Sequence, residues 1–152
     1  MAERAEMTVI FGKAPRGLMR AYRAEQQAAV KSALQYWHAS ILPKHFTTAG
    51  AREYGYEKRA KKYQQKKARS KHHQKPLVFS GHLLERMRER AQIRLRKANG
   101  SIKYTRTGIS RMQDKAVDRI AELTTVSQQD MNDLNDVMKR EFVRGVRRLQ
   151  GK

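Results

Sequence analysis

Residues 93–105 have the sequence Ile93-Arg-Leu-Arg-Lys-Ala-Asn-Gly-Ser-Ile-Lys-Tyr-Thr105, in which apolar and polar side chains alternate on both sides of an Asn-Gly pair. Asn-Gly is typical of the type I′ turn in a two-residue hairpin loop. The sequence therefore predicts a β-hairpin turning at Asn99-Gly100, with Leu95 facing Tyr104. Its core face would contain Ile93, Leu95, Ile102 and Tyr104, and its basic face Arg94, Arg96, Lys103 and Thr105.

Two long helices flank this hairpin in the sequence. Apolar residues recur at three- and four-residue steps up to Ile41, and Pro43 disfavours helix at the preceding residue, which predicts a helix over residues 17–42. The same periodicity predicts a helix over residues 128–149, with Ser127 as its N-cap. Helices packed on a small antiparallel sheet make the predicted fold class α+β. The apolar stripes are Leu18, Tyr22, Val30, Leu34, Trp37 and Ile41, then Met131, Leu134, Met138, Phe142 and Leu149.

The length of 152 residues fits a single domain, and we expect one core with two arms. Residues 1–16 contain a short β-prone run, Met7-Thr-Val-Ile-Phe11, which predicts an N-terminal arm or edge strand. Residues 44–76 have little to bury and are predicted to form a basic loop or arm. Ser80 can cap a short helix that ends near Met87, and residues 119–126 predict another strand or a helix–strand transition.

The composition narrows the class of protein. Lys and Arg number 34 against 14 Asp and Glu, so the formal net charge is +20 and the surface needs a polyanion or an acidic partner to neutralise it. The chain has no cysteine, which excludes disulfides and thiolate metal sites. No apolar run approaches the roughly 18 residues of a membrane span, and the first residues lack the apolar centre of a signal peptide. We therefore expect a protein of the cytoplasm, or of a particle assembled there.

Few residues suggest catalysis or metal binding. The adjacent His72 and His73 point to different sides of the chain, and they and His82 have no carboxylate cluster near them in the sequence. Asp114 and Asp118 are one helical turn apart, a spacing that can hold a divalent ion but is common by chance on solvated helices. No phosphate-binding loop, nucleophile elbow or zinc-protease signature is present. We expect a non-enzymatic protein without catalytic residues, cofactor or metal.

The basic arm is the strongest candidate for binding, because its aromatic residues interleave with Lys and Arg. This composition can neutralise phosphates and stack on bases, or it can meet an acidic protein surface. A solvated charged face is the third interpretation. The candidate partner-binding or DNA-binding residues are Tyr54, Tyr56, Lys58, Arg59, Lys61, Lys62, Tyr63, Lys66, Lys67 and Arg69, with Arg94, Arg96 and Lys103 of the hairpin.

The order of motifs in residues 28–87 resembles the neck, head–tail joining and tail-completion proteins of tailed bacteriophages. In that family a helix is followed by a Tyr- and Lys-bearing loop and a Pro-Leu-Val segment. The matching residues here are Trp37 at the helix end, Leu42-Pro-Lys-His45-Phe46, Tyr54-Gly-Tyr56-Glu-Lys-Arg59, Tyr63, Lys66-Lys67 and Pro76-Leu-Val-Phe-Ser80-Gly81-His-Leu83.

The resemblance implies a structural virion protein, assembled in the host cytoplasm, that forms a homo-oligomeric ring between portal and tail. Its implied partners are further copies of itself and the portal, adaptor and tail proteins. The basic arm would order only against a neighbour, and that neighbour is either an acidic protein rim or the DNA in the channel. The charge of +20 exceeds what such a ring requires, so a basic nucleic-acid-binding protein without catalytic activity is the alternative.

Overall fold

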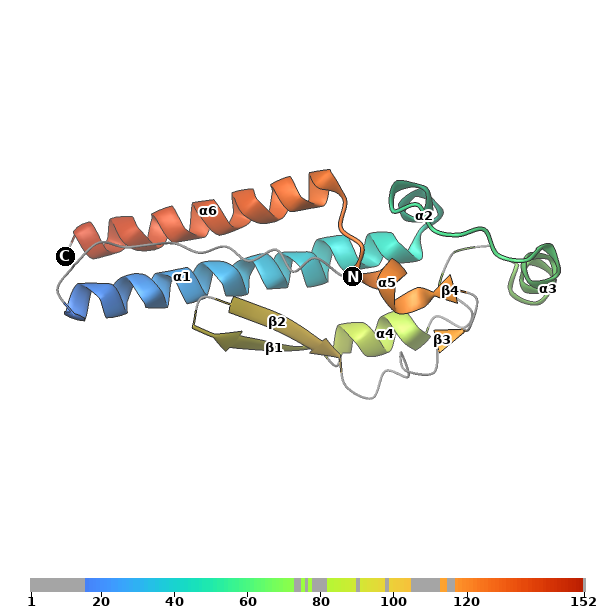
Figure 1. The fold of residues 1–152 in the computed structure, drawn as a ribbon, viewed down its shortest axis with the longest axis horizontal. Coiled ribbons are helices and arrows are strands. Elements are labelled where there is room, and N and C mark those ends of the chain that lie inside the picture. Colours follow the sequence, from blue (N-terminus) through green and yellow to red (C-terminus); the bar gives the residue numbers. More distant parts are fainter. Residues whose placement is uncertain are drawn as a thin grey trace. The chain divides into compact units, whose positions relative to one another are not determined.

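The computed structural model describes residues 16–72, 75, 77, 82–89, 91–97, 99–104, 113–114 and 117–151 (Figure 1). The described residues form two compact units. The first unit contains residues 16–37, 92–97, 99–103 and 129–151, and the second contains the other described residues between 38 and 128. A single folding domain remains a prediction.

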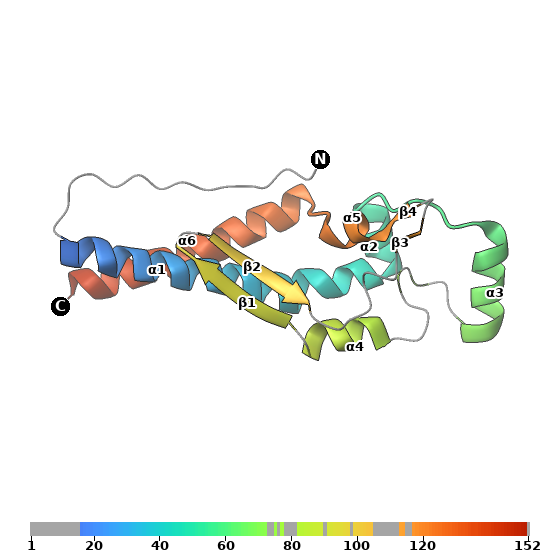
Figure 2. The same cartoon turned by 60° about the horizontal axis from the view of Figure 1, so that its bottom comes forward.

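The first unit is built on two antiparallel helices, α1 (Arg16–Tyr36) and α6 (Gln128–Gln150). They lie side by side, and the hairpin runs along α1 on the side away from α6 (Figures 1 and 2). Ala29 is fully buried, and an ion pair of 3.2 Å joins Glu25 to Arg148. The apolar stripe predicted for the C-terminal helix is half-buried throughout, whereas Leu18 at the start of α1 is exposed.

The first helix is shorter than predicted. It is α-helical to Tyr36, after which the chain continues through a π-helical turn, Trp37–Ile41, and a 3-10 helix, Leu42–Phe46. Pro43 lies in the first turn of the 3-10 helix, where its missing N–H costs nothing. The residues after Tyr36 are therefore helical but wound differently, so that Ile41 and Leu42 are both fully buried.

The hairpin is present, but its turn lies two residues before the predicted one. Strand β1 is Ala91–Arg96 and strand β2 is Asn99–Tyr104, so Asn99 and Gly100 begin a strand. Lys97 is in the turn, with a left-handed φ of 49°. The two faces are as predicted where described: Ile93, Leu95, Ile102 and Tyr104 are half-buried, and Arg94, Arg96 and Lys103 are exposed.

Packing against α1 explains the shifted turn. A Cβ at Gly100 would lie 2.6 Å from Leu34 Cδ1 and 2.8 Å from Val30 Cγ1, which is closer than real Cβ atoms approach. Leu95 therefore lies beside Gly100, with its Cδ2 3.0 Å from the same point, and does not face Tyr104 as predicted. Without a side chain, Gly100 allows this close approach of strand to helix, which favours its place in a strand over one in the turn.

In its described residues the second unit contains, besides the 3-10 helix, four short α-helices: α2 (Thr48–Glu53), α3 (Lys61–Lys71), α4 (His82–Glu89) and α5 (Arg119–Thr124). Helices α2 and α5 both pack on the 3-10 helix. Strands β3 (Gln113–Asp114) and β4 (Val117–Asp118) pair antiparallel and lead into α5. The prediction of a strand or a helix–strand transition over residues 119–126 was wrong, because the segment is helical to Thr124 and no strand follows before α6. Asp114 and Asp118 are thus on strands, and the helical spacing considered for them was wrong. The core contains Ile41, Leu42, Phe46, Met87 and Leu123.

The observed architecture confirms the α+β class: a long N-terminal helix, a C-terminal helix and a two-stranded antiparallel hairpin. Residues 1–15, 78–81 and Thr105 lie outside the described residues, so the N-terminal arm, the Ser80 cap and the last position of the basic face stay predictions. None of the helices in the described ranges has the length and apolar content that a bilayer crossing requires.

Candidate basic interface on helix α3

The segment before α3 folds into a cluster around His45 that supports the helix. We call this cluster, made of His45, Tyr54, Tyr56 and Arg59, the base. His45 comes from the 3-10 helix and is fully buried, and Tyr54 follows α2 and is 8% exposed. Their rings stack with centroids 4.0 Å apart and planes within 5°. The amide of Tyr54 donates to the carbonyl of Gly50, at 2.8 Å, which ends α2. Tyr54 thus belongs to the core of the unit.

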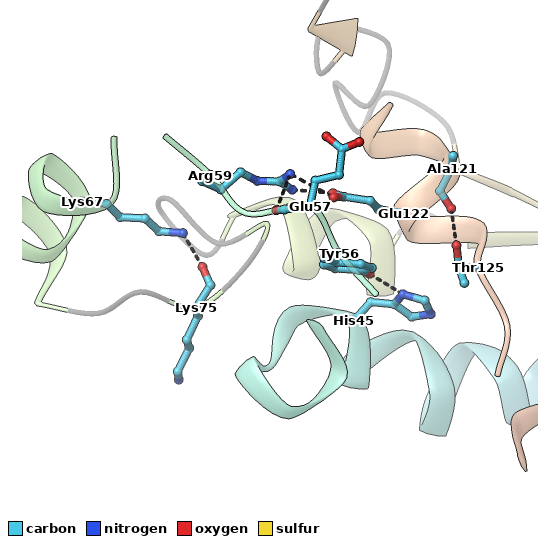
Figure 3. A network of polar contacts seen from close by, with 9 residues as sticks. All are labelled: His45, Tyr56, Glu57, Arg59, Lys67, Lys75, Ala121, Glu122 and Thr125. Carbon is cyan, nitrogen blue, oxygen red and sulfur yellow. Dashed lines mark hydrogen bonds and ion pairs between the residues drawn. The ribbon is translucent and has the colours of Figure 1, made fainter. Parts of the chain in front are cut away.

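Tyr56 extends this base by a hydrogen bond of 2.5 Å between its hydroxyl and Nδ1 of His45 (Figure 3). Burial raises the pKa of the Tyr56 phenol above its ordinary value, the negative charge of Glu122 raises it further, and Arg59 lowers it. The phenol therefore keeps its proton, and its hydroxyl shares a hydrogen bond with the imidazole. His45 is held on one side by a stacked ring and on another by a hydroxyl.

Arg59 fastens the segment to α5 through a two-pronged ion pair with Glu122 (Figure 3). One guanidinium nitrogen donates to Oε1 at 2.9 Å and the other to Oε2, and the side chains are only 18% and 9% exposed. This hydrogen bond raises the pKa of the Arg59 guanidinium. A parallel fork between Arg and a carboxylate is the most directional ion pair in proteins. The chain is therefore fixed two residues before α3 begins.

Helix α3 itself has little local support. Ala60 supplies no side-chain cap, and Lys61 and Lys62 in the first turn oppose the positive end of the helix dipole. Within the described part of its unit, α3 has no extensive packing against another helix. At its C-terminal end, His72 adopts a left-handed φ of 54° and donates its amide to Ala68. An isolated helix of 11 residues is marginal in water, so α3 depends on contacts outside its own sequence.

One side of α3 faces its own chain. Lys67 is 4% exposed and donates to the carbonyl of Lys75 (Figure 3). Its ammonium also lies 5.8 Å from the centroid of the Tyr63 ring, within cation–π range. Tyr63 is nevertheless 37% exposed, one of three large apolar side chains that are exposed in the described ranges. Lys67 is thus occupied within the chain, while the Tyr63 ring remains accessible.

The opposite side of α3 is a continuous polar face, which we call the α3 basic face. Its residues are exposed and line a shallow, open hollow of about 430 Å³. No Asp or Glu occurs in the sequence between Glu57 and Glu85, so no carboxylate from this segment offsets the charge. The face consists of Lys62, Gln65, Lys66, Arg69 and Ser70.

The predicted binding residues thus divide into three groups. Tyr54, Tyr56, Arg59 and Lys67 make contacts within the chain that stabilise the fold. Exposed on or beside α3 are Lys58, Lys61, Lys62, Tyr63, Lys66 and Arg69. Arg94, Arg96 and Lys103 are exposed on the hairpin, in the other unit.

Sequence reasoning missed Gln65 and Ser70, which are uncharged, and it missed Glu122, the partner of Arg59. Helical spacing from Lys62 would have identified the first two. Glu122 is 63 residues from Arg59, and no local pattern connects them.

The described residues contain no group of three or more His, Asp or Glu side chains placed to hold a metal ion. The chemistry that the α3 basic face offers is the binding of anions through ammonium, guanidinium, amide and hydroxyl groups. Comparison with protein-family models, with curated proteins and with solved structures found no match to this chain.

Proposed function

We propose that this protein is a non-enzymatic structural component of a tailed-phage virion, which joins head to tail as a neck connector or a tail-completion ring. The proposal begins from the resemblance over residues 28–87. Two motifs of that resemblance, at His45 and at Tyr54 to Arg59, meet in space as the base below α3. The segment that resembles the phage family thus forms a support at the start of α3.

The observation that carries the proposal is the contrast between this base and the helix it holds. In the base, His45 and Tyr54 are buried, and the Tyr56 and Arg59 side chains are hydrogen-bonded within the unit, whereas α3 lacks extensive packing and exposes the Tyr63 ring. A protomer of a closed ring needs a compact body and an element that contacts the next copy. Exposed tyrosine rings are typical anchors of such contacts, because they bury a large area at low entropic cost.

Electron microscopy of the purified protein, alone and with its neighbouring virion proteins, tests the proposal. We expect rings of fixed rotational symmetry and the presence of the protein at the head–tail junction of particles. Tyr63→Ala should raise the concentration needed for assembly by about tenfold or more. Leu18→Ala is the matched control, because Leu18 is similarly exposed, at 42% against 37%. A protein that stays monomeric at every concentration and is absent from particles would overturn the proposal.

A basic nucleic-acid-binding protein outside any virion is the second candidate, and the charge of +20 and the α3 basic face favour it. The two candidates differ in assembly. The second requires tight, salt-dependent binding to nucleic acid without rings, and genes of portal and tail proteins would not lie beside its own.

A further inference from the structure

The α3 basic face has a regular geometry. Lys62, Lys66 and Arg69 follow the i, i+4, i+7 spacing that places side chains on one side of a helix. At 1.5 Å per residue, the three cations span about 10 Å along the helix axis. Along one strand of duplex DNA, phosphates recur every 3.4 Å of axial rise, so the same length offers about 3 phosphates. The number of cations over this length is therefore close to the number of phosphates that one strand presents.

The neutral residues of the face are also suited to binding phosphate. Gln65 and Ser70 offer an amide and a hydroxyl between the cations, and both groups are common donors to phosphate oxygens. None of the five residues of this face is apolar. Interfaces between proteins usually have an apolar centre and are depleted in Lys, so a phosphate backbone fits this surface better than a protein does.

One exposed aromatic ring lies at the edge of this face. Tyr63 is seven residues before Ser70, so its side chain borders the face, and its ring centroid lies 5.8 Å from the Lys67 ammonium. One ring beside a lysine is a small platform compared with the successive rings on which proteins stack single-stranded bases. Its cations suit a charge-dense duplex, whose bases are already stacked.

We propose that the α3 basic face binds the phosphate backbone of double-stranded DNA without reading its sequence. In this arrangement Tyr63 contacts a neighbouring copy, and the three cations point to the duplex. That the DNA lies in the channel between head and tail rests on the proposed function. The binding of DNA itself does not depend on that function.

Binding of two fluorescent DNA duplexes of unrelated sequence, measured by anisotropy between about 50 and 200 mM salt, tests the inference. The variant K62A/K66A/R69A should bind both duplexes more weakly by a similar factor. Its slope of log affinity against log salt should fall by about 3, or about 1 for each cation removed. The matched control is R20A/R23A/K31A, which removes three exposed cations from α1. Both variants lower the net charge from +20 by three, to +17.

Equal losses in the two triple variants would overturn the inference, because the binding would then follow net charge and not this face. Unchanged DNA binding in K62A/K66A/R69A would also overturn it; if that variant then no longer entered particles, the face would belong to a protein partner. A circular dichroism melt checks the fold, and the three single substitutions replace the triple variant if it does not fold. Rings that persist in a variant unable to bind DNA support the inference and leave the joining role intact. DNA binding without rings in the wild type would leave the inference standing and reject the joining role.

Discussion

The base around His45 and the helix α3 are neighbours in the sequence, and both combine aromatic and basic residues. Their side chains nevertheless lie in opposite environments. In the base, Tyr54, Tyr56 and Arg59 are buried or bonded within the unit. In α3, most of the cations are solvated. Composition alone does not separate a binding surface from a scaffold. The separation depends on whether a partner such as Glu122 arrives from elsewhere in the chain.

The largest expected difference between the two regions is in local stability. Amide hydrogen exchange should show the amides of Tyr54 and Tyr56 opening only with the whole unit, at a cost of about 5 kcal/mol or more. Both amides are bonded to carbonyls of α2. In the free protein the amides of residues 64–71 should open with a free energy near zero. In the assembled particle they should become protected from exchange. Strong protection of these residues already in the monomer would show that α3 orders itself.

Gly50→Ala should be the most damaging single substitution in the base. A Cβ at this position would lie 2.0 Å from the carbonyl oxygen of Lys44, and backbone atoms cannot move aside as a side chain can. We expect a loss of about 3 kcal/mol in the free energy of unfolding, measured by urea denaturation. Gly17→Ala is the control, because a Cβ there meets nothing within 4 Å. Equal stability of the two variants would mean that the base is looser than described.

Removing the charge of Glu122 should lower the free energy of unfolding by less than Gly50→Ala does. It should also weaken the ion pair that holds the chain just before α3. Glu122→Gln leaves the Arg59 guanidinium largely buried without its carboxylate, and we expect a loss of about 2 kcal/mol in the free energy of unfolding. Glu85→Gln, in an exposed pair with His82, should change it by less than about 0.5 kcal/mol. If thermal melts showed the two variants to be alike, the Arg59–Glu122 pair would not be what secures α3.

The smallest expected effect is a loss of stability in alkali. Burial raises the pKa of the phenols of Tyr56 and Tyr104 above the ordinary value of about 10. The folded state therefore holds these protons more tightly than the unfolded state. Their contribution is present below pH 10 and is lost as the pH rises further. In denaturation series at rising pH, Tyr104→Phe should reduce this loss of unfolding free energy by about 1 kcal/mol or less. A curve of unfolding free energy against pH that runs parallel to that of the wild type would contradict the prediction.

The fold was largely predictable because its main signals are local. The stripe from Met131 to Leu149 and the alternation around Leu95 depend only on nearby residues, and both correctly indicated the buried side. The end of α1 and the position of the hairpin turn were not predictable, because each depends on packing that no short window contains. The candidate site divides in the same way: exposed cations such as Lys66 were found from composition, while the partners of Arg59 and Lys67 required the structure.

The hairpin also bears on how the chain folds. Asn99-Gly100 is the local preference for a turn, but the packed hairpin turns at Lys97, and Gly100 lies in a strand close to Leu34 and Val30 of α1. Local preference and tertiary packing therefore favour different registers of the same two strands, and both registers keep the apolar side chains on one face. Such a conflict is a form of frustration. Before α1 docks, the isolated hairpin should form with its turn at Asn99-Gly100, and docking should then select the native register and set the rate at which this unit matures.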